Sequence, residues 1–133
     1  MNLQLGAALL STAFLFGGSL LYSSAFAAFL FRELPAAQAG GLLRRAFSGY
    51  YLWVMATALL AALLYLGIDA TSSYVLAAIA LSTIPVRQSL MPAINAASDH
   101  GKRRRFQRLH GVSIAIGLLQ IAAAGYVLLR APP

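Results

Sequence analysis

The stretch PVRQSLMPAINAASDHGKRRRFQRLHGVS, from Pro85 to Ser113, interrupts a chain that is otherwise almost unbrokenly apolar. It contains an Arg, an Asn, an Asp, a cluster of Lys and Arg, and a His. An ionisable side chain at the centre of a membrane helix costs roughly 2.5 to 3.5 kcal/mol. The concentration of such groups in one stretch therefore calls for a reason, either in the topology or in a functional site.

The composition of the whole chain is that of a membrane protein. Of its 133 residues, 60% are hydrophobic and 10% are charged, and the mean hydropathy is +0.76. A soluble domain carries about 25% charged residues. The formal net charge of +7 comes from residues between apolar segments, so we attribute it to membrane orientation rather than to nucleic-acid binding. The absence of Cys excludes disulfides, thiolate metal sites and thiol redox chemistry.

Four apolar segments are each long enough to cross about 30 Å of hydrocarbon at 1.5 Å per residue. We predict transmembrane helices at about 5–31, 46–68, 72–91 and 108–129. The first is expected to be an uncleaved helix, because no Lys or Arg precedes it and it is longer than the apolar core of a signal peptide. Since the connections are short, the simplest architecture is a single all-α domain over residues 1–133, an integral membrane antiparallel four-helix bundle.

The connections differ in charge, and this difference predicts the orientation. The first, 32–45, is expected to be broken by Pro35 and Gly40-Gly41, and the third spans 92–107. The second is a turn near Asp69, where Asp69, Thr71 or Ser72 can cap the third helix. The residues that we predict to orient the protein lie in the first and third connections: Arg44, Arg45, Lys102, Arg103, Arg104 and Arg105. By the positive-inside rule these connections face the cytoplasm, where they attract anionic lipid headgroups, and both termini lie on the other side.

The fourth predicted helix carries a stripe of small and polar residues. Its members recur at three- and four-residue spacing and so share one face: Phe106, His110, Ser113, Gly117, Gln120 and Ala124. In lipid such a face is expected to meet other helices. One interpretation is simple helix packing, and the other is a polar cavity in which His110 acts as a ligand or proton carrier.

A second group of polar residues lies near the end of the third predicted helix. Pro85 removes a backbone hydrogen bond and should kink the helix beside Arg87. Arg87 is interpreted either as an interfacial anchor or as a partner of Asp99, Glu33 or an anion. If the helix continues after Pro92, Asn95 and Asp99 share a face and form a polar patch with Arg87 at the cytoplasmic mouth; the alternative is ordinary turn chemistry.

Small and aromatic residues mark the first two helices. Ser11, Gly18, Tyr22 and Ala25 fall on one side of the first helix, which predicts a helix contact there. Tyr50, with Tyr51, stands near the start of the second helix, where an interfacial tyrosine belt is the usual interpretation. We also count Tyr50 among the candidate solute-binding residues.

Several chemistries find no support in the sequence. With only two His residues and no His-x-x-His or Glu-x-x-His spacing, a His-rich zinc or di-iron site cannot be assembled within one chain. Ser113 lies one helical turn from His110, but no acid or oxyanion site accompanies the pair. We therefore predict no metal site and no catalytic residue, although the sequence leaves open whether any catalysis occurs.

Two segments carry a family resemblance. Arg87-x-x-Leu90-x-Pro92-x-Ile94-Asn95-x-x-x-Asp99 and Phe106-x-x-Leu109-His110-x-x-Ser113 resemble the transmembrane protein 205-like family, whose bacterial branch is domain of unknown function 4149. The resemblance implies a four-helix membrane protein, in a bacterial inner membrane, with eukaryotic relatives linked to platinum-drug resistance and possible efflux or trafficking. Sulfur ligation of a metal could involve only Met55 and Met91, because the chain has no Cys.

The leading hypothesis is a transport or efflux component for a small solute or metal species, acting as a homo-oligomer or within a larger membrane complex. Its predicted solute-binding residues are Arg87, Asn95, Asp99, His110, Ser113, Gln120 and Tyr50. A first alternative is a haem-binding or redox membrane protein with His110 as an axial ligand, although no cofactor is predicted otherwise. A second alternative is a non-catalytic assembly or interaction subunit.

Overall fold

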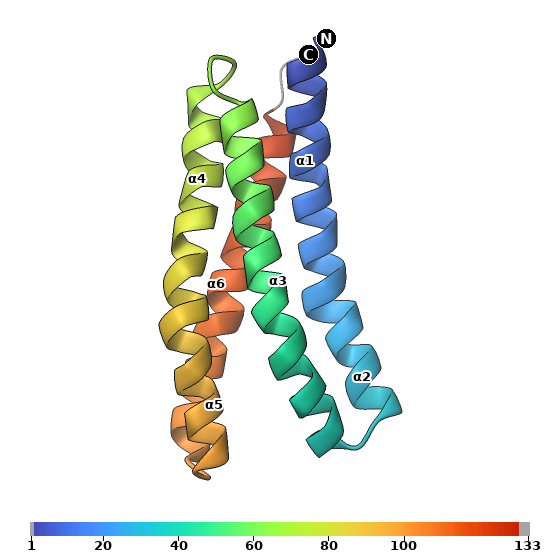
Figure 1. The fold of residues 1–133 in the computed structure, drawn as a ribbon, viewed down its shortest axis with the longest axis vertical. Helices are drawn as coiled ribbons and strands as arrows, with labels where there is room; N and C mark the ends of the chain where they lie inside the picture. The colour runs from blue at the N-terminus through green and yellow to red at the C-terminus, as the bar shows by residue number, and fades with distance from the viewer. Residues whose placement is uncertain (1, 131–133) are drawn as a thin grey trace.

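The protein folds as an antiparallel bundle of four long helical segments, as seen in a computed structural model that describes residues 2–130 (Figure 1). The first segment comprises α1 (Leu3–Leu20), the π-helix η1 (Leu21–Phe26) and α2 (Ala27–Glu33), and the second is α3 (Ala36–Leu64). The third segment comprises α4 (Ala70–Pro85), the π-helix η2 (Val86–Leu90) and α5 (Met91–Asp99). The fourth is α6 (Arg103–Leu129). The segments contain 31, 29, 30 and 27 residues and are all apolar enough to cross a membrane. The predicted all-α membrane bundle is confirmed.

The helices extend further at one end of the bundle than the sequence predicts. The expected breaks at Gly40-Gly41 and Pro92 are wrong, because α3 begins directly after Pro35 and α5 continues to Asp99. Each Gly inside a helix costs about 1 kcal/mol, which a long helix tolerates, and Pro92 stands directly after the π-helical turn η2, where the pattern of backbone hydrogen bonds already departs from α-helix. The basic connections are therefore short, and much of their charge lies on helices.

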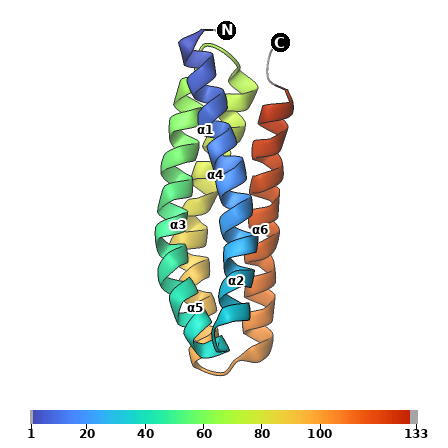
Figure 2. The ribbon, with the colours of Figure 1, turned by 90° about the vertical axis from the view of Figure 1, so that its right-hand side faces the viewer.

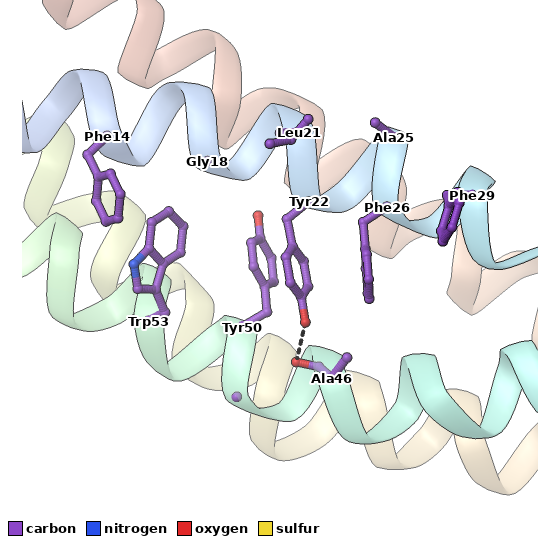
Figure 3. Close-up of a pocket in the computed structure, with 11 residues that line it drawn as sticks. Phe14, Gly18, Leu21, Tyr22, Ala25, Phe26, Phe29, Ala46, Tyr50 and Trp53 are labelled. Atoms are coloured by element: carbon purple, nitrogen blue, oxygen red, sulfur yellow. Dashed lines mark hydrogen bonds between the residues drawn. The ribbon is translucent and has the colours of Figure 1, made fainter.

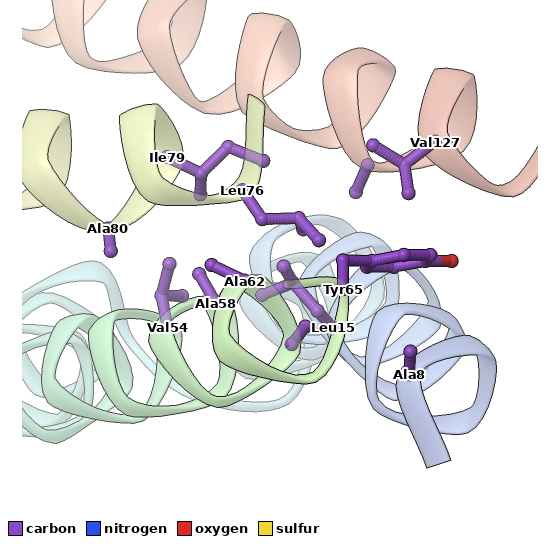
Figure 4. Close-up of a cluster of buried hydrophobic side chains, with 12 residues drawn as sticks. Ala8, Leu15, Val54, Ala58, Ala62, Tyr65, Leu76, Ile79, Ala80 and Val127 are labelled. Carbon is purple, nitrogen blue, oxygen red and sulfur yellow. The ribbon is translucent and has the colours of Figure 1, made fainter. Parts of the chain in front are cut away.

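The four segments pack in a ring. α1 contacts α3 and α6, and α4 contacts the same two helices from the opposite side (Figure 2). Figure 4 shows the buried core between them, which includes Leu15, Ala58, Leu76 and Val127. Several core positions are Ala, and small side chains let helix backbones approach closely in lipid.

One end of the bundle holds the start of α1, the end of α6 and the turn between α3 and α4 (Figure 1). Arg130 pairs with Asp69 across this end, with 3.0 Å between Nε and Oδ2. Asp69, one of the three residues predicted to cap this helix, stands at the N-cap position of α4, but its carboxylate accepts a hydrogen bond from the Ser72 hydroxyl, at 2.6 Å, rather than a capping bond from a backbone N–H. The bonds from Arg130 and Ser72 lower the pKa of Asp69 from 3.8 to about 2.

The opposite end carries both basic connections (Figure 2). Here α2 packs against α3, and α5 packs against α6. Two arginines bridge these helix pairs. Arg44 on α3 pairs with Asp99 on α5 at 2.7 Å, and Arg87 on η2 donates to the backbone oxygen of Ser48 on α3 at 3.1 Å. Two polar residues of the Pro85 to Ser113 stretch, Arg87 and Asp99, thus help to hold the helices together at this end.

Candidate functional site

A lateral groove lies between the first segment and α3 (Figure 3). Its volume is about 760 Å³, within the usual range of small-molecule sites. The lining residues come from α1, η1 and α2 on one wall and from α3 on the other: Phe14, Gly18, Leu21, Tyr22, Ala25, Phe26, Phe29, Ala46, Gly49, Tyr50 and Trp53. Phe14, Leu21 and Phe29 are exposed at its rim, so the groove opens on the outer surface of the bundle.

Stacked aromatic rings form the floor of the groove. The rings of Tyr22 and Tyr50 are parallel within 2°, with centroids 4.9 Å apart, and Tyr22 also stacks on Phe26 at 4.9 Å. Further along, Phe14 meets Trp53 edge to face at 5.1 Å. Such pairs contribute about 0.5 to 1.5 kcal/mol beyond the area they bury, so they hold the two walls at a fixed spacing.

The π-helix η1 supplies four of the lining residues. The Ser23 hydroxyl donates to the carbonyl oxygen of Ser19 at 2.6 Å, and the Ser24 hydroxyl donates to that of Leu20. Ser side chains compete in this way for carbonyl oxygens of the preceding turn, which favours a local departure from α-helix. Short π-helical turns are frequent at functional sites, and here the wider turn forms a wall of the cavity.

Glycines determine where the walls approach and where they part. A Cβ at Gly18 would come within 2.5 Å of the Trp53 ring, so only Gly permits this contact. A Cβ at Gly49 would meet nothing within 4 Å, because Gly49 faces the open part of the groove. The Tyr22 hydroxyl donates to the Ala46 carbonyl oxygen at 3.1 Å and joins the walls beyond this gap (Figure 3).

Tyr50 and Gln120, two of the predicted site residues, both line a second, small cavity. This cavity holds about 10 Å³, room for about one water molecule. The Gln120 amide donates to the hydroxyls of Ser82 at 2.8 Å and Thr83 at 3.0 Å on α4. Gln120 therefore bonds to a neighbouring helix, which is the packing role expected of the polar stripe.

Arg87, Asn95 and Asp99 lie at the basic end but do not contact one another as a single patch. Asp99 pairs with Arg44, which also donates to the backbone oxygen of Asn95 at 3.3 Å. Arg87 contacts Ser48 through its hydroxyl, at 3.2 Å, as well as its backbone oxygen. Asp99, one of the partners predicted for Arg87, is therefore paired with Arg44 instead. Pro85, where we predicted a kink, is followed directly by the π-helical turn η2, which contains Arg87.

His110 does not face the bundle interior, so that part of the predicted stripe is corrected. His110 is exposed and stacks on Phe106, with ring centroids 5.4 Å apart. The first turns of α6 form a hairpin with α5, which covers only one of their faces. Ser113, one turn further, is half-buried, and its hydroxyl lies 3.5 Å from that of Tyr51. The stripe faces other helices from Ser113 onward.

Most of the groove, including Phe14, Phe29 and Trp53, is not predicted from the sequence. The spacing of Gly18, Tyr22 and Ala25 predicts a contact face on the first helix. These three residues do line the groove. Nothing in the spacing indicated that the facing side of α3 would carry Gly49 and leave a gap.

No group of three or more His, Asp or Glu side chains with metal-binding geometry occurs within residues 2–130. The predicted orienting residues Lys102 to Arg105 are all exposed.

Comparison with known proteins gives one match. No curated protein and no solved structure is significantly similar to this chain. The family model described as a domain of unknown function (DUF4149) matches residues 10–103, well over half of the chain. The matched region includes both walls of the groove and the bridges at the basic end. This integral membrane four-helix protein belongs to the DUF4149 family.

Proposed function

We propose that this protein is a small transport or efflux component that accepts a lipophilic solute from the bilayer through the groove between the first segment and α3. The observation that carries the proposal is the groove of about 760 Å³. Three of its lining residues bear a polar side-chain atom, namely Tyr22, Tyr50 and Trp53. A mostly apolar cavity with a few polar groups is the usual form of a small-molecule site.

The paired polar groups of the bundle interior favour a lateral route over a central one. Gln120 is bonded to Ser82 and Thr83, and the neighbouring cavity holds only about 10 Å³. A polar solute passing along the axis of one bundle would have to break these bonds. A lipophilic solute entering from the lipid would meet aromatic rings at once.

The basic end supplies an element that could open. The α2–α3 pair and the α5–α6 pair are bridged there by Arg44 with Asp99 and by Arg87 with Ser48. If these bridges were released, the α2–α3 pair and the α5–α6 pair would separate at the basic end. A solute in the groove would then reach the polar residues there, including Asn95. One chain of 133 residues offers little room for alternating access, so we propose that it acts as a homo-oligomer or within a larger membrane complex.

The proposed location is the bacterial inner membrane. Lys102 to Arg105 and Arg45 are exposed at the same end of the bundle. The positive-inside rule places this end in the cytoplasm, with the α3–α4 turn and the start of α1 on the other side.

The test uses the single tryptophan, Trp53, which lines the groove. The protein in nanodiscs is titrated with N-phenyl-1-naphthylamine, a neutral apolar dye that accepts energy from tryptophan. We expect saturable quenching of Trp53 fluorescence, and export of the same dye from proteoliposomes. In Gly49→Leu the new Cβ meets nothing within 4 Å and the rest of the side chain occupies the groove, so this substitution should abolish both signals.

Gly17→Leu is the matched control, because a side chain at this exposed position of α1 also meets open space but does not line the groove. It should leave quenching and export unchanged. If quenching rises linearly with dye and is the same in wild type, Gly49→Leu and Gly17→Leu, the groove binds nothing and the proposal is overturned.

A further inference from the structure

We infer that the groove receives the acyl chain of an anionic phospholipid whose headgroup lies at Arg32 and Arg45. This inference rests on the proposed function, because it takes the groove to be a site for lipophilic molecules. It goes further by naming the chemical class of the occupant and the two side chains that select it.

Both arginines continue the walls of the groove toward the basic end. Arg45 directly precedes Ala46 and lies one helical turn before Gly49 on α3. Arg32 lies three residues beyond Phe29 on α2. Residues three or four apart occupy the same side of a helix, and both arginines are exposed. Their long side chains can lie along apolar surface while the guanidinium groups reach the headgroup layer.

The charge at this mouth is available to an anion. The ion pairs among residues 2–130 are Arg44 with Asp99 and Arg130 with Asp69, so neither Arg32 nor Arg45 is neutralised by an acid there. Glu33, next to Arg32, is also exposed, so Arg32, Glu33 and Arg45 together carry a net charge of +1. A guanidinium group binds phosphate oxygens through two parallel hydrogen bonds, which suits a phospholipid headgroup.

The length of the groove suits a lipid chain. From Phe14 to Phe29 the first segment rises by about 20 Å at 1.5 Å per residue. Half of the hydrocarbon core, the depth of one leaflet, is about 15 Å. A chain anchored at the arginines would thus run along the groove past Phe29 and Phe26 toward Trp53. An inorganic phosphate would leave the apolar walls unused, and a neutral lipid would leave the arginines unused.

Trp53 again reports occupancy, because bromine atoms on a lipid chain quench tryptophan only at short range. The protein is reconstituted in mixtures of unlabelled phosphatidylcholine with dibrominated phosphatidylglycerol or dibrominated phosphatidylcholine. We expect relative binding constants at least about fivefold higher for the anionic lipid, the effect of roughly one basic residue at a membrane surface. In the Arg32→Gln, Arg45→Gln variant the two lipids should quench equally.

The control variant, Arg103→Gln with Arg104→Gln, loses the same charge from α6 and should keep the preference. Equal quenching by the two lipids in the wild-type protein overturns the inference, as does an equal loss of preference in the control. If Gly49→Leu nevertheless abolishes dye binding, the proposed function survives this failure. Native mass spectrometry that finds a dimer, with Trp53 shielded from both brominated lipids, would overturn the inference in favour of a second copy in the groove.

Discussion

The indole ring of Trp53 lies so close to Gly18 that a Cβ at residue 18 would stand 2.5 Å from ring carbon Cη2. This contact joins α1 to α3 where Phe14 also packs edge to face on the indole. The rings of Tyr22 and Tyr50 form the next layer toward the basic end. The depth of the groove therefore depends on a residue that has no side chain.

Gly18→Ala should push the indole of Trp53 out of its position and into the groove. Overpacking of a tight contact costs about 1 to 3 kcal/mol, so the free energy of unfolding should fall by that amount. The fluorescence emission maximum of Trp53 should also shift. Gly17→Ala places the same methyl group in open space and should change neither quantity. Identical emission spectra in both variants would contradict the packing described for Gly18.

The Asp69–Arg130 pair predicts an acid-dependent loss of stability. The pKa of Asp69 is about 2 in the folded protein and 3.8 in its ordinary state, so the pair stabilises the fold above about pH 4. This stabilisation, about 1 kcal/mol for a partly exposed pair, is lost as the pH falls toward 2. Thermal unfolding in detergent should show a smaller acid-induced decrease for Arg130→Gln than for wild type. Parallel pH profiles for the two proteins would rule the contribution out.

The Arg44–Asp99 pair should act as a latch between α3 and α5. Its side chains are 37% and 58% exposed, so its coupling energy in a double-mutant cycle of Arg44→Gln and Asp99→Asn should be only about 0.5 to 1 kcal/mol. The distribution of distances between spin labels on α3 and α5 should nevertheless broaden in either single variant. Arg104→Gln removes a neighbouring positive charge without touching Asp99 and serves as the control. Unchanged distance distributions in Arg44→Gln would exclude the latch.

Gln120→Leu should loosen the contact between α6 and α4. Interhelical hydrogen bonds in membranes contribute about 0.6 to 1.7 kcal/mol, and this substitution removes the bonds to Ser82 and Thr83 at nearly constant volume. Unfolding by a denaturing detergent should show a loss of about 1 kcal/mol. Gln107→Leu, at an exposed position of the same helix, should have no comparable effect. Equal stability of all three proteins would mean that Gln120 is not part of the packing.

The sequence predicts the number and order of the spanning helices because hydropathy accumulates over some 20 residues. It places their ends poorly, since Pro92 resembles a break but lies within the third helical segment, whereas Pro35 does separate α2 from α3. Helices that extend beyond the hydrocarbon carry Arg44 and Asp99 and bring them together. Apolar length says nothing about such extensions.

The candidate site was harder to predict than the fold for a physical reason. In an apolar chain the ionisable residues stand out, so Arg87 and His110 are the residues that the sequence predicts for a site. The groove instead depends on the shapes of Gly18, Gly49 and Trp53, which are ordinary membrane residues until two helices are placed side by side. Polarity can be read from a sequence, but a gap between two apolar surfaces cannot.

The π-helix η1 gives the first segment one residue more than a regular helix would need over the same stretch. Loss of a single residue between Leu21 and Phe26 would restore α-helical winding, and because the wide turn absorbs the extra residue, Phe29 and Arg32 beyond it would keep facing α3. Only the turn that forms this wall of the groove would narrow. A relative in the same family with one residue fewer here would keep the bundle and present a different lining at this turn, so chain length in this turn is a marker of what the groove can hold.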